Sequence, residues 1–530
     1  SNKTTAPIKV LDAKKVILTL ADNTTNTITD SSRLSTEEDY SAAIYSKEDL
    51  IINGNGTLNV NAGYRNGIKS TDDCIIVSGT LNITSTEDGI IGKDLCGVVA
   101  GDININAGSD GIKSTYDTDT TKGNVIIEGG NITIKASNDG IQAENILVIN
   151  DGAINIKTNN GAADTTQTHI DNMDMGRGGF GFNHNKTTTT TDDTSESRKG
   201  IKAGNMLIIN DGDITIDSDD DSVHCNSVIY IYGGTINAAT GDDGVHADDL
   251  LTVNGGTINI TQCYEGIEAD DIVINDGDIS VVSSDDGINS SDGSITINGG
   301  NLLINASGDG LDANGSIIIN GGYIVVLGPT SDGDTAIDYD DSCTINGGTV
   351  MAFGSSGMLE IPKGASNGAC IVTAFTSVSG GSKYTLSDSN GNEILSYTPS
   401  KAYAAAIVYS DKITTGNTYD ITAGSTTLSI EVTSDVTSNV SSGLGKAGGM
   451  NMPGNGGSGM PNNGSSDNGM NRNSNGSMPD MSGNGAPDMN GNSSGDMPSM
   501  GGNSSNNGGN MPNMNNGSSN GSAPQMNNRM

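Results

Sequence analysis

The chain has 530 residues and a formal net charge of −39, and only 33% of its residues are hydrophobic. So negative a field disfavours nucleic acid and anionic membrane surfaces as partners. No stretch is long and apolar enough for a transmembrane span, and 75 glycines without a single Trp do not fit a broad globular core.

A repeat with a step of about 22 residues follows a short N-terminal strand or cap segment, residues 1–40, and runs through residues 41–351. Each unit has a Gly-containing turn followed by an alternating strand, and the last glycine of this phrase stands at positions 56, 79, 101, 130, 152, 212, 234, 256, 277, 300, 322 and 348. The step is too short for helical-pair repeats, and the alternation has period two. We predict an all-β fold, a right-handed parallel β-helix of about twelve coils.

Three segments depart from the repeat. One coil carries a surplus at 161–198, which we predict to be a loop insertion that either shelters a ligand groove or is tolerated extra length. Residues 352–440 keep strand-like runs without the period, and a β-rich cap there would cover open strand edges. Residues 441–530 are built mainly from Gly, Asn, Ser, Pro and Met, and we expect a disordered spacer or surface tether.

Two smaller regularities concern the turns and the cysteines. An Asn precedes many turns, and these amides should stack as a ladder along the rod; the positions are Asn210, Asn254, Asn275, Asn298, Asn320 and Asn346. Cys74 and Cys96 lie one coil apart, so they face each other either as a disulfide or as two free thiols.

Acidic residues recur in register in the second half of the repeat. Residues 203–362 contain 27 Asp and Glu and no Lys or Arg. The acids in or just after successive turns are Asp220, Asp221, Asp242, Asp243, Glu265, Glu268, Asp285, Asp286, Asp309 and Asp312. One reading is a solvated acidic face that keeps the protein soluble. However, carboxylates one strand spacing apart repel by roughly 3 kcal/mol per pair at an effective dielectric of about 20, and the regular register favours neutralisation by a cation.

Calcium is the cation that these acids would suit best. It accepts six to eight oxygen ligands in irregular geometry, including carboxylates and turn carbonyls, whereas magnesium demands stricter octahedral order. We therefore expect Ca²⁺ as the cofactor, held by the ten acids given above. His224 and His246 occupy equivalent positions of adjacent coils, but because no cysteine cluster joins them we interpret them as a surface ladder and not as a soft-metal site.

Three sequence features resemble a known family. The segments 43–54 and 87–94, together with the serial Asp-Gly-Ile-x-Ala coils, resemble the bacterial carbohydrate-binding-domain family of secreted parallel β-helix proteins. This resemblance spans residues 40–350 and implies a calcium-dependent, polysaccharide-lyase-like architecture that binds cellulose and pectic acid. It also implies a secreted or cell-surface location.

Some acidic turns also look like the calcium-binding turns of β-helical pectate lyases. The best matches are 242–244 and 285–287, and the resemblance makes Asp220, Asp221, Asp242, Asp243, Asp285 and Asp286 the first ligands to test. Two turns depart from the pattern, because Ser222 follows Asp221 where Gly is expected and Tyr264 precedes Glu265 where Asp is expected.

Three functions follow from these features. We favour a monomeric binder of plant cell-wall polysaccharides, in which calcium ligates the carboxylates of an acidic pectic glycan and Tyr230, Tyr232 and Tyr323 stack on sugar rings. Cellulose binding rests on the resemblance alone, because aromatic residues make up only 3% of the chain. The first alternative is a pectate lyase with Lys202 as the base, for which Lys69 and Lys113 occupy equivalent positions. The second is a surface stalk or adhesin that calcium stiffens.

Overall fold

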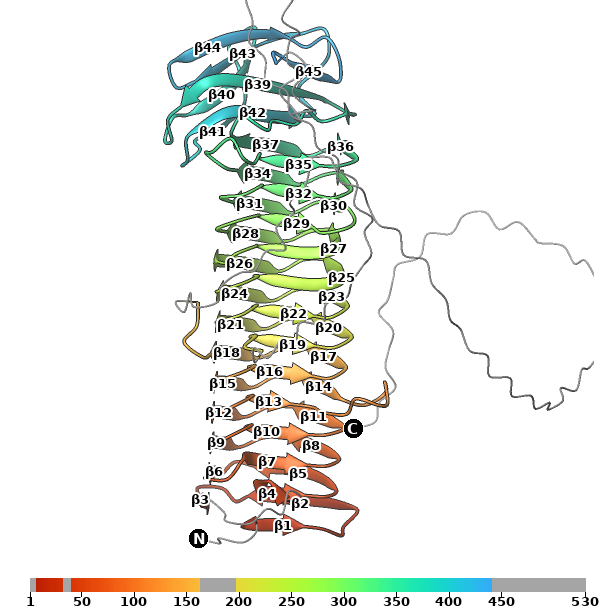
Figure 1. Ribbon diagram of the computed structural model, residues 1–530, viewed down its shortest axis with the longest axis vertical. Helices are drawn as coiled ribbons and strands as arrows, with labels where there is room; N and C mark the ends of the chain where they lie inside the picture. The colour runs from red at the N-terminus through yellow and green to blue at the C-terminus, as the bar shows by residue number, and fades with distance from the viewer. Residues whose placement is uncertain (1–5, 32–39, 163–196, 441–530) are drawn as a thin grey trace, which may run out of the picture. The chain divides into compact units, whose positions relative to one another are not determined.

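The computed structural model describes residues 6–31, 40–162 and 197–440, which all belong to one compact unit, 1–451. These residues form β-strands and no α-helix. Two long sheets contain 25 and 16 strands, and a third sheet contains four. The predicted all-β parallel β-helix is confirmed, with strands stacked coil upon coil (Figure 1).

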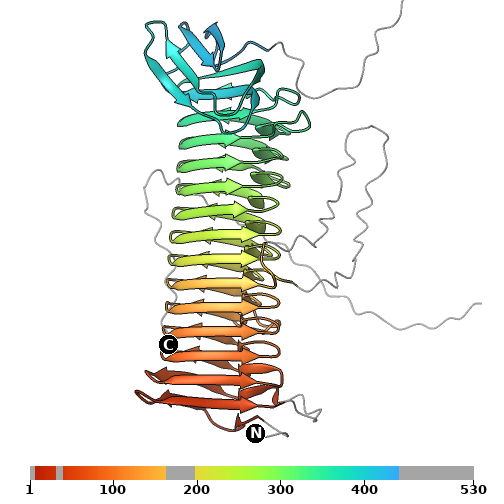
Figure 2. The same ribbon diagram turned by 90° about the vertical axis from the view of Figure 1, so that its left-hand side faces the viewer.

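One coil from the first half shows the plan that the others repeat. β10 (Ile90–Gly92) and β11 (Leu95–Val98) lie in the 25-stranded sheet, and β12 (Asp102–Ala107) lies in the 16-stranded sheet. Each strand pairs in parallel with its counterparts one coil earlier and one coil later, which produces three ladders of parallel strands. Figure 2 shows one of these ladders face-on, with all its strands pointing the same way.

The first ladder carries the side chains that matter most for function. Its strands are β1 (Ile8–Val10), β4 (Ala42–Ser46), β7 (Asn66–Ser70), β10, β13 (Ile112–Lys113), β16 (Ile141–Ala143), β19 (Ile201–Ala203), β22 (Val223–Cys225), the start of β25 (Val245–Val253), the start of β27 (Ile267–Ile274), β29 (Ile288–Ser290), β32 (Leu311–Ala313) and β35 (Ile337–Tyr339). From β4 onward the inward-facing Ile, Val and Leu side chains of this ladder are fully buried and stack along the core, and Ile8 of β1 packs against them partly buried.

The stack contains one coil more than the sequence indicated. Thirteen parallel strands, from β3 (Thr25–Asp30) to β37 (Thr349–Gly354), follow one another in the 16-stranded sheet. The additional coil lies within the predicted N-terminal segment and comprises β1, β2 (Lys15–Leu20) and β3. Its turn uses Asn23, which has a φ of 58°, in place of the glycine by which we recognised the other coils.

Glycine recurs in the repeat because the turn requires a backbone conformation with positive φ. At eleven of the twelve predicted positions, all except 56, the glycine has a φ between 82° and 131°, a region that side chains disfavour. In the turn that contains position 56, Gly54 takes this role with a φ of 101°. The repeat is therefore set by a backbone requirement of the turn.

The Asn ladder is present and the cysteines are free. Asn275, Asn298, Asn320 and Asn346 each donate a side-chain hydrogen bond of 2.8–3.0 Å to the Asn one coil earlier. Tyr232 occupies the ladder position between Asn210 and Asn254 and interrupts it. Cys74 and Cys96 are aligned in adjacent strands as buried free thiols.

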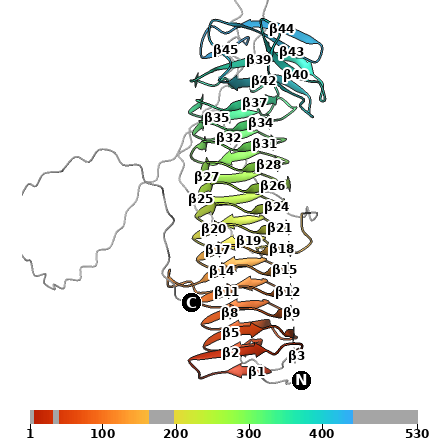
Figure 3. The ribbon, with the colours of Figure 1, turned by 180° about the vertical axis from the view of Figure 1, so that it is seen from behind.

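A β-rich region follows the last coil. β37 pairs antiparallel with β42 (Tyr403–Ser410), which pairs with β39 (Ala369–Val378) and so extends the 16-stranded sheet. A separate antiparallel sheet comprises β41 (Glu393–Tyr397), β40 (Tyr384–Asp388), β43 (Thr418–Ala423) and β44 (Thr426–Glu431). Figure 3 shows these strands over the end of the coil stack. The open edge of β37 is thereby paired.

Two of the predicted segments lie largely or wholly outside the residues that the structure describes. The predicted loop insertion at 161–198 lies almost entirely outside the described residues, and the predicted tail at 441–530 lies wholly outside them. The repeat resumes in register after the insertion, because β16 pairs with β19. No helix in the described ranges has the length and hydrophobicity that crossing a membrane requires.

Candidate metal centre

One acidic residue stands at the same place in the turn before most strands of the first ladder. We name these residues the turn-acid file: Asp88, Asp110, Asp139, Asp221, Asp243, Glu265, Asp286 and Asp309. One carboxylate oxygen usually accepts the backbone N–H of the equivalent turn residue one coil later. Examples are Asp110 N–H to Asp88 at 3.1 Å, Asp243 N–H to Asp221 at 3.1 Å and Asp309 N–H to Asp286 at 2.6 Å. This bond explains why an acid recurs there and leaves the second oxygen for other partners.

The residue three positions after the turn-acid position, which other residue types occupy in some coils, forms a second row, the outward file. The strand register aligns its members coil by coil: Lys69, Ile91, Lys113, Gln142, Lys202, His224, His246, Glu268, Asn289, Asp312 and Asp338. The charge that faces the turn acids thus changes along the stack from basic through histidine to acidic. This change divides the file into three environments.

In the basic part, Lys113 neutralises the turn acid Asp110. Lys113 Nζ lies 2.5 Å from Asp110 Oδ2. Although burial would lower the pKa of Lys113, the Asp110 carboxylate raises it overall. A lysine held in its charged form so firmly is a structural counter-ion and a poor general base.

The predicted group Asp220, Asp221 and Asp242 is brought together, with one oxygen of each within 4.8 Å of the others. Lys199, which the sequence analysis overlooked, already neutralises part of it: its Nζ lies 2.8 Å from Asp220 Oδ1 and 2.6 Å from Asp221 Oδ2. Burial alone would raise the pKa of Asp221, but Lys199 and His224 hold it well below its usual value. A bound cation is therefore not needed to balance this group.

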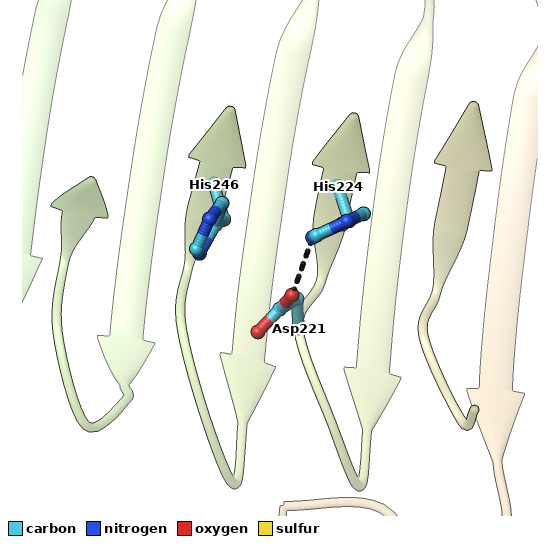
Figure 4. A group of neighbouring side chains, drawn as sticks. All are labelled: Asp221, His224 and His246. Atoms are coloured by element: carbon cyan, nitrogen blue, oxygen red, sulfur yellow. Dashed lines mark hydrogen bonds and ion pairs between the residues drawn. The ribbon is translucent and has the colours of Figure 1, made fainter. Parts of the chain in front are cut away.

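The two histidines occupy the middle of the outward file. Their ring centroids lie 5.0 Å apart with the ring planes tilted by 40°, and Figure 4 shows the two side chains on neighbouring strands. His224 is buried and does not belong to a surface ladder. His224 Nδ1 lies 2.8 Å from Asp221 Oδ2, and its Nε2 lies 2.8 Å from Asn226 Oδ1. Both ring nitrogens of His224 thus have one protein partner each.

His246 has a different set of neighbours. Its Nδ1 lies 2.9 Å from Asp243 Oδ2 and also 2.9 Å from Glu268 Oε2. Burial opposes a charged imidazole, yet the hydrogen bonds that it donates to the carboxylates of Asp243, Asp248 and Glu268 raise the pKa of His246 strongly. Burial also raises the pKa of Asp243, whereas His246 outweighs burial at Glu268 and lowers the pKa of that residue.

The acidic part contains a cluster without a basic residue, Asp286, Asp309 and Asp312, which we name the acid-only triad. One oxygen of each lies within 4.8 Å of the others. Burial, followed by the repulsion of neighbouring carboxylates, raises the pKa of Asp286 to about 9 and that of Asp312 to about 7. Burial and nearby acids likewise raise the pKa of Asp309 to about 8. At neutral pH these groups compete for protons, so a divalent cation would relieve them.

The other two predicted acids flank the acid-only triad. Burial and Glu268 raise the pKa of Glu265 to about 8, and Asn289 Nδ2 donates to its Oε2 at 2.9 Å. Asp285 lies beside Asp286, and a Cβ added to Gly308 would stand 2.4 Å from an oxygen of both. Glycine at 308 therefore leaves the space into which these two carboxylates turn.

The predicted tyrosines lie at a different turn of the coil. Tyr230 and Tyr232 stack with ring centroids 6.4 Å apart where β23 (Val228–Ile231) ends, and Tyr323 begins β34 (Tyr323–Leu327). Tyr232 and Tyr323 are 49% and 45% exposed, so both rings are accessible. The register places Tyr323 four coils from Tyr230, about 19 Å at normal strand spacing. Tyr230 and Tyr323 hence do not form one pocket.

The predicted lyase base also stands apart from the acid-only triad. Lys202 Nζ donates to Ser197 Oγ at 3.1 Å, and the residue is aligned with Gln142 and His224. Four strand steps, about 19 Å, separate its strand from β29, which follows the turn of Asp286.

A further acidic group, which the sequence did not indicate, lies on the neighbouring ladder. It consists of Asp49, Asp72 and Asp73, and Lys15 lies 3.7 Å from Asp49.

Comparisons with known proteins find sequence similarity along most of the chain. The model of a family described as carbohydrate-binding domain-containing protein matches residues 1–244 and 242–431. A carbohydrate-binding domain-containing protein of Acetivibrio thermocellus is 38% identical over 87 residues, which are 16% of this chain and 30% of that relative.

A solved structure is also similar in sequence. It is titled as the polysaccharide lyase-like protein from C. thermocellum, gadolinium derivative, and shares 34% identity over 30% of this chain and 65% of its own, with a TM-score of 0.29. The chain thus covers less than two thirds of either relative. Because the family model matches most of its length, the chain belongs to the family of carbohydrate-binding domain-containing proteins.

Proposed function

We propose that this protein is an extracellular, calcium-dependent binder of acidic plant cell-wall polysaccharide, and that Asp286, Asp309 and Asp312 hold the calcium. The observation that carries the proposal is the acid-only triad, three converging carboxylates in a stretch, 203–362, without Lys or Arg. Family membership supports carbohydrate as the ligand class.

The donor set of the acid-only triad suits a hard cation. All the converging atoms are carboxylate oxygens, which are the ligands that calcium takes in irregular arrangements. Asp286 and Asp309 each use one oxygen to hold the next turn, at Asp309 N–H and Thr335 N–H respectively, so the turns fix the positions of both side chains. A calcium ion bound there would supply positive charge to which the carboxylates of a uronate polymer can coordinate.

The tyrosines would add a second contact on the same polymer. Tyr232 presents an exposed ring stacked on the half-buried Tyr230, and aromatic faces of this kind pack on sugar rings. Their distance from the acid-only triad requires an extended ligand. A polysaccharide meets that requirement, whereas a monosaccharide does not.

Binding fits the arrangement better than cleavage. A lyase that uses calcium to acidify the substrate needs a base beside the calcium-bound uronate. Lys202 lies about four strand steps from the turn of Asp286, too far to reach the same sugar. We therefore propose binding without a catalytic residue.

The test is native electrophoresis through a gel that contains polygalacturonate, with calcium or with a chelator. Wild type is compared with the double variant Asp309→Asn and Asp312→Asn. The matched control is Asp276→Asn with Asp278→Asn, which removes the same charge from two exposed acids at another turn.

We expect calcium-dependent retardation of wild type and control, and free migration of the triad variant. Unchanged migration of wild type in both gels would rule out pectic acid as the ligand. Equal retardation of all three proteins would place the polymer away from the acid-only triad. Clearing of the embedded polymer would show lyase activity and direct attention to Lys202.

A further inference from the structure

The three residues Asp243, His246 and Glu268 form a second convergence of metal-binding atoms, which we name the His246 triad. One ligand atom of each lies within 4.8 Å of the others. Asp243 and His246 come from the same coil at a spacing of three, and the strand register places Glu268 of the next coil beside His246. The triad is therefore fixed by the turn of one coil and the pairing of two strands.

The contacts of His246 Nδ1 exceed what one proton can satisfy. This nitrogen lies 2.9 Å from Asp243 Oδ2 and 2.9 Å from Glu268 Oε2, yet it carries at most one hydrogen. Two carboxylate oxygens and one imidazole nitrogen therefore crowd around a single point. A divalent cation at that point would satisfy all three atoms at once.

The neighbours of the His246 triad resemble the outer shell of a metal site. His246 Nε2 lies 3.5 Å from Asp248 Oδ1, and a carboxylate at the second ring nitrogen is what usually orients a metal-binding histidine. Asp243 Oδ1 accepts the N–H of Glu265 at 3.3 Å, which directs Oδ2 toward the imidazole. Asp243 is only 6% exposed, so its orientation is held by packing as well.

We propose that the His246 triad is a binding site for a transition-metal dication of the Zn²⁺ class, separate from the acid-only triad. The mixture of one imidazole and two carboxylates suits zinc, which prefers nitrogen and accepts oxygen, better than calcium, which takes oxygen alone. Three protein ligands leave a fourth position for water or for an oxygen of a ligand.

Asp221, His224 and His246 also bring one ligand atom each within 4.8 Å of one another, but a basic side chain already stands in that group. His224 faces Asp221 in the same i, i+3 relation, but Lys199 Nζ lies 2.6 Å from the same Asp221 oxygen and occupies the place of a cation. The second ring nitrogen of His224 already has Asn226 as its partner. His224 is thus a matched control within the same ladder.

The experiment is a calorimetric titration of the full chain with Zn²⁺ in the presence of saturating Ca²⁺. The variants are His246→Gln and Glu268→Gln at the ligands, Asp248→Asn behind the imidazole, and the control His224→Gln. A second control replaces His169 and His184, the remaining histidines of the chain, by Gln. Melting curves without metal establish that each variant is folded.

We expect wild type and both controls to bind one Zn²⁺ with equal affinity. Asp248→Asn should weaken binding by about 10- to 100-fold, the usual effect of an outer-shell change, and the two ligand variants by more. The double variant of the acid-only triad, Asp309→Asn with Asp312→Asn, should keep zinc binding. No saturable binding by wild type, or equal binding by His246→Gln, would overturn the proposal.

Discussion

The two halves of the coil stack use the same turn for different purposes. At Asp110 in the first half and at Asp286 in the second, one carboxylate oxygen accepts the N–H of the turn residue one coil later, at 3.0 and 2.6 Å. The other oxygen of Asp110 meets Lys113, whereas the carboxylate of Asp286 belongs to a cluster of acids. Asp110 and Asp286 thus have the same backbone role but opposite electrostatic surroundings.

This difference separates what maintains the fold from what serves function. An acid that is bonded to the next turn and paired with lysine is fully explained by structure. An acid that shares a half-buried space with two other acids costs free energy in the absence of a cation. The excess of negative charge in the second half therefore indicates a ligand, and exchanging charges between the halves tests that view.

The largest effect is expected from Lys113→Asp, which gives the first half the charges of the second. It leaves Asp110, 3% exposed, without its ion-pair partner and adds a third acid near Asp88. In chelator we expect a loss of about 3 kcal/mol in the free energy of unfolding, as for other broken buried pairs. Urea unfolding measures it, and Lys113→Gln separates loss of the pair from added repulsion. A loss below 1 kcal/mol would contradict the pairing role.

The next effect is the pH dependence of the metal-free protein. The folded-state pKa values of Asp286, Asp309 and Asp312 are raised from 3.8 to about 9, 8 and 7, so the folded state binds more protons than the unfolded state. Their contribution is fully present below pH about 4 and is lost as the pH rises through about 7 to 9. We expect a decrease on the order of 2 kcal/mol between pH 5 and pH 9.

The measurement for this prediction is the urea midpoint at several pH values in chelator. The double variant Asp309→Asn with Asp312→Asn removes two of the titrating groups and should flatten the curve. Calcium should restore the stability of wild type at pH 9. A wild-type curve that rises between pH 5 and pH 9 while the variant stays flat would have the wrong sign for this account.

A smaller gain is expected from Asp312→Lys, which gives the second half the charges of the first. The lysine faces Asp309 in the spacing that Lys113 has to Asp110, and it should stabilise the metal-free protein by about 1–2 kcal/mol. The variant should also lose its calcium-dependent rise in melting temperature. Melting curves with calcium and with chelator measure both effects. A variant that calcium still stabilises as it does wild type would contradict the assignment.

The smallest effect concerns the Asn ladder, which serves structure only. Asn298→Ala removes one amide that is bonded to Asn275 and Asn320. Because these amides are exposed, we expect a loss of about 1 kcal/mol in the free energy of unfolding, independent of calcium. Urea unfolding with and without calcium measures it, and a calcium-dependent loss would connect the ladder to the metal centre.

Much of the fold could be predicted from the sequence because the turn imposes a residue type. A glycine with positive φ recurs once per coil, and its step gives both the period and the stacking. The first coil lacks this marker, since Asn23 takes the conformation there, and it was therefore counted as a cap. The side-chain bonds between turns were not foreseen, although the recurring acid was their signal.

The site was harder to predict because it depends on which charges meet across coils. The repeat brought the ten acids into register, but it did not show that Lys199 neutralises Asp220 and Asp221. Lys199 follows Asp139 by 60 positions, about three times the usual step, so the spacing in the sequence does not show that the two residues occupy equivalent turn positions. Aligning the outward file from Lys202 to Asp312 would have revealed the change from basic to acidic residues.

The central claim is that calcium binds at the acid-only triad because its turn acids, Asp286 and Asp309, have no basic counter-ion among the described residues. The most direct test is a calorimetric Ca²⁺ titration of the full chain and of two matched variants. The double variant Asp309→Asn with Asp312→Asn removes charge in the second half. The double variant Asp88→Asn with Asp110→Asn removes the same charge in the first half. The new amides at positions 88, 110 and 309 can still accept the backbone N–H of the next turn. We predict that only the second-half variant loses a calcium ion; loss from the first-half variant, or from neither, would contradict the account.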